Sequence, residues 1–279
     1  NISVITSCDE TLIPFDELVM AQYDRKRLSP SAAGQHAPSF EDLSEGYRRV
    51  VADIAPSRAQ LEESLAAIES MRPTLADNNA EEAAHQAVTA ARARLNMLDA
   101  GVAIIEQSLM ATEAFLNCQG GWRAVINADA AAREATALLR EMSEANVRAS
   151  MEESDEAVTQ LNDARELFTK AQGAYPGLDL DSFIAYVEKR LEAQQAALAS
   201  DQAYLDRDKE ALAEENDRYN ALEAEAAALA QDLGDDPDQR VANRFYESIE
   251  DQVTVYEAER LKAGNADTFL RNYLGKSVQ

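Results

Sequence analysis

The longest regular pattern of hydrophobic positions in the chain lies between Asp179 and Leu233. Every seventh residue from Ile184 onward is apolar, and this spacing predicts one helix of roughly 50 residues with a continuous apolar stripe. A helix of that length needs a partner to bury the stripe. The stripe consists of Ile184, Leu191, Leu198, Leu205, Leu212, Tyr219, Ala226 and Leu233.

The second interface position of this heptad pattern is polar in several turns, for example at Gln194, Asp201 and Asp208. A two-stranded coiled coil with polar side chains in alternate layers would be weak. We therefore expect nearby alanines to widen the apolar face so that the helix contacts two neighbours. These alanines are Ala196, Ala197, Ala203 and Ala211.

Two more long helices are predicted before this one, over residues 78–117 and 122–172. Asp77, Asn78 and Asn79 supply capping side chains at the first start, because their oxygens accept bonds from unpaired backbone N–H groups. Gly120-Gly121 is the clearest helix stop in the chain, and Trp122 follows at the expected corner. The third of the three longest helices is then residues 180–233.

The ends of the chain predict shorter elements. Residues 1–14 are expected to be extended, and a helix is expected from Pro14 to about Leu28. A helix opening at Phe40 is expected to kink or break at Pro56, because proline lacks the N–H donor. Near the C-terminus, the expected boundaries are a start at Asp236-Pro237, a stop at Gly264-Asn265 and a last short helix over residues 267–274.

These elements predict an all-α fold, an elongated antiparallel up-down helical bundle with long coiled-coil-like helices. We expect residues 1–279 to form a single elongated helical domain. Aromatic residues gather towards both ends of the chain, so residues 10–72 and 235–279 are expected to form a thicker globular end. Residues 78–233 are expected to form the long antiparallel helices.

The charge balance narrows the classes of partner. The chain has 51 acidic and 26 basic side chains and a formal charge of −25. This argues against nucleic acid as a partner, because phosphate binding needs a basic surface. It favours protein partners, a basic one being complementary. No run of 18 apolar residues occurs, so no membrane-spanning segment is expected.

The sequence contains no Gly-rich phosphate loop, no HExxH or CxxC motif and no Gly-x-Ser-x-Gly elbow. His36 falls in an expected loop, and His85 has no second ligand one turn away. The acidic turn 232–238 has the residue types of a calcium loop without the spacing, so it is expected to cap helices, with loose cation binding as the alternative. We therefore assign no catalytic, cofactor-binding or metal-ligating residues, and expect no cofactor and no enzymatic activity.

The two cysteines, Cys8 and Cys118, allow either one disulfide, which would indicate an oxidising compartment, or two unrelated thiols. Residues 5–8 have the shape of a bacterial lipobox, although the segments that should precede one are missing. Because the chain begins at Asn1 and not at Met, an upstream segment is expected to have been removed.

Three functions remain open. The first is a non-enzymatic extracytoplasmic bacterial protein, secreted or envelope-anchored, that acts as a binding or spacer module. The alternatives are a cytoplasmic coiled-coil scaffold from a larger assembly and a cation-binding helical protein. The heptads and alanine-rich helices resemble those of spectrin-like and bacterial helical-hairpin surface proteins, a likeness too general to identify a family.

Overall fold

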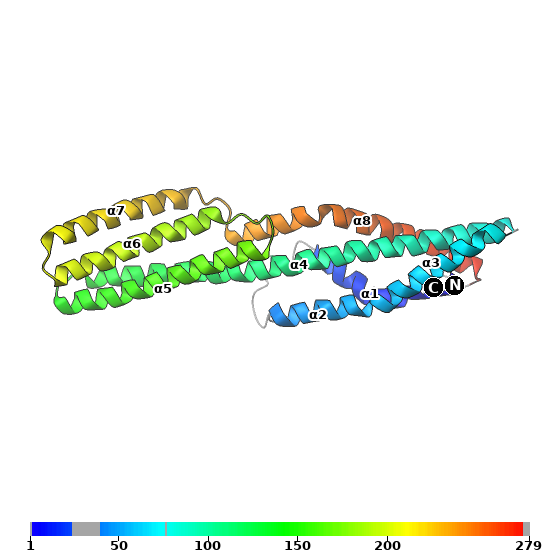
Figure 1. Cartoon of the computed structure of the whole chain (residues 1–279), viewed down its shortest axis with the longest axis horizontal. Coiled ribbons are helices and arrows are strands. Elements are labelled where there is room, and N and C mark those ends of the chain that lie inside the picture. The colour runs from blue at the N-terminus through cyan, green and yellow to red at the C-terminus, as the bar shows by residue number, and fades with distance from the viewer. Residues whose placement is uncertain (1, 24–39, 76, 276–279) are drawn as a thin grey trace. The chain divides into compact units, whose positions relative to one another are not determined.

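The computed structural model describes residues 2–23, 40–75 and 77–275, without the side chains of residues 6–11 and 42–43. Over this part, the chain forms eight α-helices, one short 3-10 helix and no strand. The helices pack against one another, so the predicted all-α bundle is confirmed (Figure 1).

The helices group into two compact units. Unit 1 consists of Asn1–Leu109 with Phe245–Gln279, and unit 2 is Met110–Arg244. Whether these two units behave as the single elongated domain expected from the sequence stays a prediction. Each unit is described by itself below.

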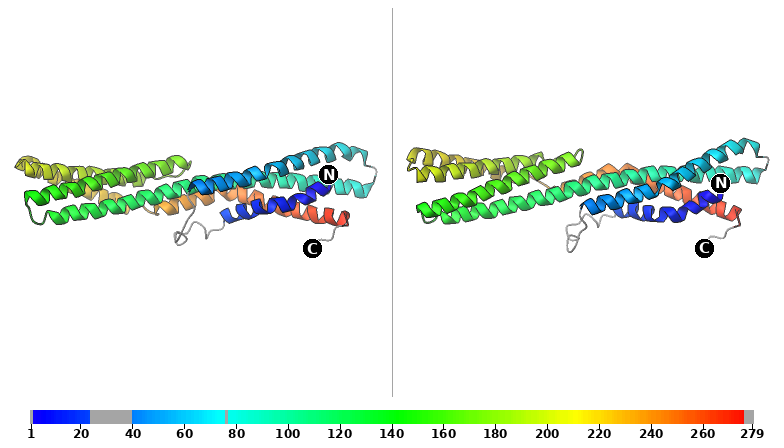
Figure 2. Two further views of the ribbon diagram at one scale, coloured as in Figure 1. Left: turned by 90° about the horizontal axis from the view of Figure 1, so that it is seen from below. Right: turned by 60° about the horizontal axis from the view of Figure 1, so that its bottom comes forward.

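Unit 1 is built from three complete helices and parts of two longer ones. In both views of Figure 2, α1 lies beside the C-terminal part of α8. Its elements are α1 (Ile2–Gln22), α2 (Phe40–Asp53), α3 (Ala55–Met71), the 3-10 helix η2 (Arg72–Thr74), the first part of α4 (Asn78–Leu138) and the second part of α8 (Pro237–Tyr273).

Several predicted boundaries of unit 1 are confirmed. Helix α2 starts at Phe40, and the predicted break at Pro56 falls where α3 begins. Helix α4 starts at Asn78, where the Asp77 side chain accepts a hydrogen bond from the Asn79 backbone N–H at 3.2 Å. That bond satisfies one of the unpaired donors at the start of the helix.

The predicted extended segment over residues 1–14 is wrong. Helix α1 begins at Ile2 and contains Pro14, so the proline is inside the helix and does not start it. Ile5, Leu12, Phe15 and Val19 are all buried on one face of α1, and this burial outweighs the backbone hydrogen bond that the proline removes. The expected end of this helix near Leu28 lies outside the described residues.

A buried glutamine joins three helices of unit 1. The Gln22 side-chain oxygen accepts hydrogen bonds from the Tyr47 hydroxyl at 2.9 Å and the Ser108 hydroxyl at 2.7 Å. These residues belong to α1, α2 and α4, and all three are buried. The bonds satisfy polar groups that would be costly to bury alone.

Unit 2 contains the remainder of α4 and the start of α8, with three complete helices between them. Helices α6 and α7 form an antiparallel pair, and α6 also packs against α5 (Figure 1). The three helices are α5 (Glu144–Ala174), α6 (Asp181–Leu205) and α7 (Lys209–Gln231).

The predicted stop at Gly120-Gly121 is wrong, because α4 continues through it to Leu138. The two glycines instead let α5 approach closely. A Cβ atom on Gly121 would lie 3.0 Å from the buried ring of Phe168, and one on Gly120 would lie 3.2 Å from Leu167. The chain turns at Ser143, whose hydroxyl accepts from the Asn146 N–H at 3.2 Å and caps α5. The expected helices 78–117 and 122–172 therefore have wrong boundaries.

The predicted continuous helix over residues 180–233 is also wrong. Helix α6 ends at Leu205, which is only half-buried, and α7 begins at Lys209. Arg207 takes the left-handed conformation with φ of 61°, and the Asp208 N–H bonds the Ala203 carbonyl at 2.9 Å. This is the Schellman arrangement that ends many helices. The Asp208 side chain then caps α7 by accepting from two backbone N–H groups at 3.1 Å.

The start of α8 at Pro237 is confirmed, but its predicted stop at Gly264-Asn265 is not. The helix continues to Tyr273, so the separate short helix expected over residues 267–274 is part of it. Ala263, Ala266 and Leu270 are buried on one face, which holds the glycine in helical conformation.

Helix α1 packs against α4 at Gly101, and we expect Gly101→Ala to destabilise the protein. The new Cβ would lie 2.6 Å from the ring of Phe15, which is fully buried and has nowhere to move. Overpacking of this kind costs roughly 1–3 kcal/mol in the free energy of unfolding, measured by urea denaturation.

Gly173→Ala is the matched control, because no atom lies within 4 Å of its new Cβ in α5. It should stabilise the protein by about 0.5–1 kcal/mol through helix propensity alone. Equal effects of the two substitutions would contradict the close packing of α1 on α4.

Candidate ligand-binding cleft

Unit 1 contains a cleft of about 820 Å³ lined by residues of α1, α4 and α8. One part of its lining is apolar and the other is polar and charged. The apolar side chains are Leu12, Ile13, Met20, Met97 and Leu261, and the charged or phenolic ones are Asp16, Tyr23, Arg94, Glu257 and Arg260.

Asp16 is the centre of a polar network at this cleft. Its carboxylate accepts a hydrogen bond from the Tyr256 hydroxyl at 2.6 Å and a bifurcated one from Arg260 Nε, which lies 2.9 and 3.0 Å from the two carboxylate oxygens. Burial, followed by the hydrogen bond to Asp16, raises the pKa of Tyr256 above its usual range. The hydrogen bond to Asp16 likewise raises the pKa of Arg260. Residues of α1 and α8 are thereby joined by charge-assisted bonds.

A second ion pair joins α4 to α8 at the cleft. Arg94 lies 3.2 Å from Asp267, with only 3% and 8% of the two side chains exposed. Arg271 Nε also donates to Asp267 at 2.6 Å. The buried charges of Arg94 and Asp267 are therefore compensated by each other and by Arg271.

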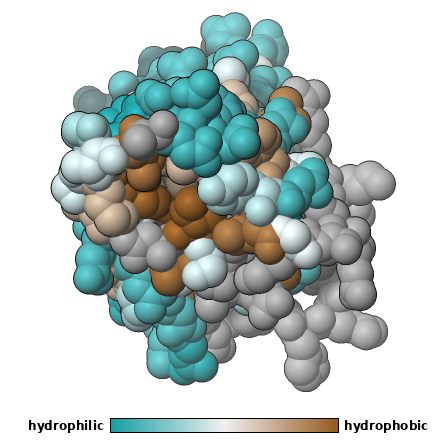
Figure 3. All heavy atoms as spheres, turned by 90° about the vertical axis from the view of Figure 1, so that its right-hand side faces the viewer, coloured by the Kyte–Doolittle hydropathy of each residue, from teal (hydrophilic) through white to brown (hydrophobic). Residues whose placement is uncertain are grey.

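A smaller cleft of about 500 Å³, lined by residues of α4 and α8, adjoins the first one. Leu261 and Asn265 line both clefts, so this part of α8 forms a ridge between them. Leu261 is 67% exposed, and Ile13, Met20 and Phe269 are also exposed large hydrophobic residues. Figure 3 shows hydrophobic residues gathered on the face where α1 begins and α8 ends, among hydrophilic ones. A surface of this kind is typical of interaction sites.

Cys118 shows no sign of a reactive thiol site. Cys118 is a free, fully buried thiol on α4, and burial, with a smaller contribution from Asp238, raises its pKa to about 12. It stays protonated at neutral pH and is a poor nucleophile. The side chain of Cys8 lies outside the described residues, as does His36.

The other candidate residues from the sequence have structural surroundings. His85 is exposed on α4. Trp122 packs edge-on against Phe183, with ring centroids 6.0 Å apart, and lies within α4 and not at a corner. In the acidic turn 232–238, Asp232 is the C-terminal cap of α7 and the Asp235 carboxylate accepts from Asn243 at 3.4 Å. Within the described ranges, no three His, Cys, Asp or Glu side chains are placed to hold a metal ion.

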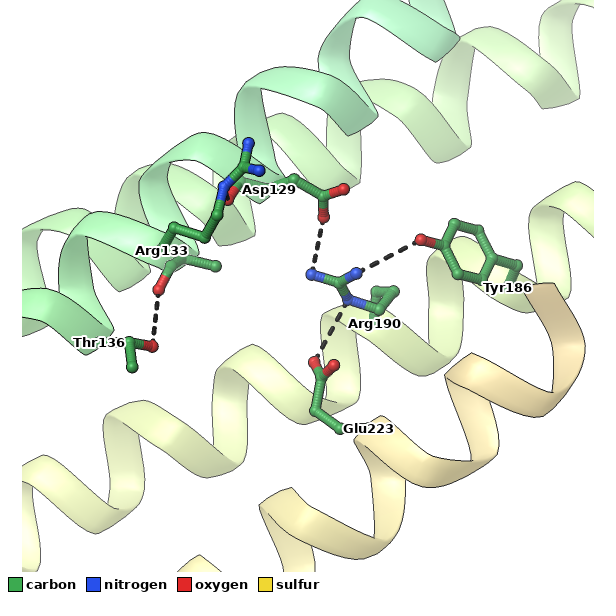
Figure 4. Close-up of polar contacts among 7 residues, drawn as sticks. Asp129, Arg133, Thr136, Tyr186, Arg190 and Glu223 are labelled. Carbon is green, nitrogen blue, oxygen red and sulfur yellow. Dashed lines mark hydrogen bonds and ion pairs between the residues drawn. The ribbon is translucent and has the colours of Figure 1, made fainter. Parts of the chain in front are cut away.

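A second polar cluster lies in unit 2, around Arg190 of α6 (Figure 4). Its guanidinium contacts Asp129 of α4 at 2.8 Å, Glu223 of α7 at 3.3 Å and the Tyr186 hydroxyl at 3.3 Å. Burial opposes the charge, but Glu223 and Asp129 outweigh it, so the pKa of Arg190 is raised. Beside it, Lys189 lies 3.2 Å from Glu225 of α7. We interpret this cluster as structural, because its ion pairs join α6 to α4 and α7 of the same unit.

Two of the polar heptad positions of α6 are buried. Gln194 is 2% exposed and Asp201 is 5% exposed. Burial raises the pKa of Asp201, and the nearby Ser150 hydroxyl of α5 opposes this shift in part. The Asp201 Oδ2 atom is buried without a hydrogen-bond partner among the described residues. This carboxylate is a cost to folding at neutral pH.

Comparison with known proteins adds no identification: no family model matches the chain, and no similar curated protein or solved structure is found. In the part of the chain that the structure covers, no helix is long and apolar enough to cross a bilayer.

We expect Asp201→Asn to stabilise the protein at neutral pH. The raised pKa means that the folded state holds this proton more tightly than the unfolded chain does. The carboxyl therefore favours folding below about pH 4, and that contribution is lost as the pH rises through the folded pKa. Asparagine is uncharged at both pH values, so it avoids the cost of burying the ionised carboxylate. The increase in unfolding free energy of Asp201→Asn over the original protein should therefore be larger at pH 7 than at pH 4.

Urea denaturation of both proteins at the two pH values measures this difference. Asp163→Asn is the control, because Asp163 is exposed on the neighbouring α5. If Asp201→Asn and Asp163→Asn changed the unfolding free energy at pH 7 by the same amount, Asp201 would be solvated in the folded state.

Proposed function

We propose that this chain is a non-catalytic helical binding module of a bacterial cell, acting outside the cytoplasm, which takes an apolar segment of a protein partner into the cleft lined by α1, α4 and α8. The observation that carries this proposal is the cleft of about 820 Å³ with large hydrophobic residues still exposed at it. Exposed hydrophobic surface at a concave site gains free energy when a ligand covers it.

The two clefts on either side of Leu261 favour a protein segment over a small molecule. A partner that contacts both must extend across the ridge of α8, and Leu261 would then be covered from both sides. Central, fully covered apolar side chains of this kind contribute most of the energy in many protein interfaces.

The net charge of −25 bears on which protein can occupy the cleft. A second copy of the chain would carry the same charge and be repelled, whereas a basic partner would be attracted. We therefore take a basic protein as the occupant.

Binding is preferred to catalysis because most charged groups at the cleft are already engaged with one another. Asp16 is held by Arg260 and Tyr256, and Arg94 pairs with Asp267. Groups compensated in this way fix the positions of helices and are poorly placed to move protons to and from a substrate.

The cleft can be tested with a variant that fills it. Gly264 lies in α8 at the cleft, and no atom lies within 4 Å of a Cβ placed there. A Cβ therefore fits at this position without a clash, and Gly264→Leu should stabilise the helix by about 0.5–1 kcal/mol. It should also abolish the binding of apolar peptides selected on the original protein from a library of random peptides, measured by fluorescence anisotropy.

Gly173→Leu, which adds the same side chain at an open position of α5, should leave peptide binding unchanged. Selected peptides that bind Gly264→Leu as tightly as the original protein would place the binding surface elsewhere. A selection that yields no peptide would contradict the proposed function.

The extracytoplasmic location rests on composition, namely the strongly acidic surface and the presence of only two cysteines. Cys118 is a buried free thiol, so no disulfide at this residue supports the extracytoplasmic location. We expect the protein in the envelope or secreted fraction of its native cells, detected by immunoblotting. Recovery with cytosolic markers would favour the alternative of a cytoplasmic scaffold.

A further inference from the structure

The charges at the main cleft are compensated with one exception. Asp16 pairs with Arg260, and Arg94 pairs with Asp267, which Arg271 also contacts, so each of these cleft residues has a partner of opposite charge. Glu257 also lines the cleft and makes no ion pair among the described residues. Arg260 lies three residues further along α8, but its Nε is directed to Asp16. The cleft therefore carries one uncompensated carboxylate beside its apolar wall.

Tyr23 supports this account of Glu257. The pKa of Tyr23 is raised, first by burial and then by the negative charge of Glu257, to which its hydroxyl donates a hydrogen bond. A carboxylate has about four lone-pair positions, so this single bond leaves most of its acceptor capacity available. Glu257 is exposed, and it loses its water only when a ligand covers the cleft.

Glu257 and Leu261 are four residues apart on α8 and face the same side of the helix. A ligand that covers the exposed Leu261 side chain therefore brings its neighbouring groups to Glu257. An apolar or anionic group there would leave the carboxylate dehydrated and unpaired, which is costly, whereas a cationic group would pair with it.

From this arrangement we propose that Glu257 is a specificity-determining residue, which selects a partner segment carrying a lysine or arginine next to the apolar side chains that cover Leu261. This inference rests on the proposed function, because it names the chemistry of the partner at the same cleft. The partner's cation forms a charge-assisted hydrogen bond to Glu257, shared with the Tyr23 hydroxyl.

The test repeats the random-peptide selection on two proteins, the original and Glu257→Gln. On the original, peptides should be enriched in a basic residue at a fixed spacing from apolar ones. On Glu257→Gln, the apolar preference should remain and the basic preference should disappear. A selected peptide should lose about tenfold in affinity on Glu257→Gln, and its binding should become less sensitive to salt.

Two further variants sharpen the result. Glu257→Lys should reverse the preference, so that acidic residues replace basic ones at the same spacing. Glu250→Gln is the control, because Glu250 is an exposed carboxylate of α8 outside both clefts, and its peptides should match those of the original protein. Thermal unfolding of each variant confirms that it is folded.

The outcomes separate this inference from the proposed function. Apolar peptides without a basic preference, or with the same basic preference on Glu257→Gln, would overturn the role of Glu257 and leave the cleft as a binding site. The loss of all peptide binding on Gly264→Leu, together with the loss of only the basic preference on Glu257→Gln, is the result that supports both. If no peptide binds the original protein, both are wrong.

Discussion

The distance at which helices can approach one another controls this structure. Alanine is the commonest buried residue of the described part, and a helix faced with alanine buries little surface unless its neighbour comes close. At Gly101 and Gly121 the approach is closer still, because the rings of Phe15 and Phe168 occupy the space of a missing Cβ. The long helices hold together because small residues on one are matched by large residues on the next.

At the cleft, small residues of one helix are not matched by large residues of a neighbouring helix. Ala263 and Gly264 of α8 are as small as the residues that bring helices together elsewhere, but no side chain fills the space opposite Gly264. The charged pairs at the cleft keep α1, α4 and α8 in place without filling it. A ligand would supply the packing partner that the chain itself does not.

The sequence predicted the fold class and the helix starts at Phe40, Asn78 and Pro237, because the signals for a helix start are local in the sequence. It failed at Gly120-Gly121 and Gly264, since a glycine ends a helix or admits a neighbour according to tertiary contacts. The break at Asp206–Asp208 was missed because Arg207, and not glycine, takes the left-handed position. The nearby signal was Asp208, an effective N-cap in a stretch where the heptad also becomes polar.

The cleft could not be predicted from local patterns. Asp16 and Arg260 are 244 residues apart, and no motif links them. Exposed hydrophobic residues such as Leu261 look the same in sequence as buried ones. The acidic composition disfavours nucleic acid and favours a basic protein, and the class of partner stays a prediction.

Helix α7 is held differently from its neighbours in unit 2. Only Leu222 and Ala226 are buried along it, whereas α5 and α6 each bury a longer series of residues. Besides the half-buried Tyr219, which packs against Ala193, Ala196 and Leu222, its contacts with α6 include two ion pairs, from Arg190 to Glu223 and from Lys189 to Glu225. Acid and salt weaken such ion pairs and leave apolar packing almost intact. We therefore expect the backbone amides of α7 to exchange with solvent sooner in acid or at high salt, because these conditions weaken the ion pairs along it.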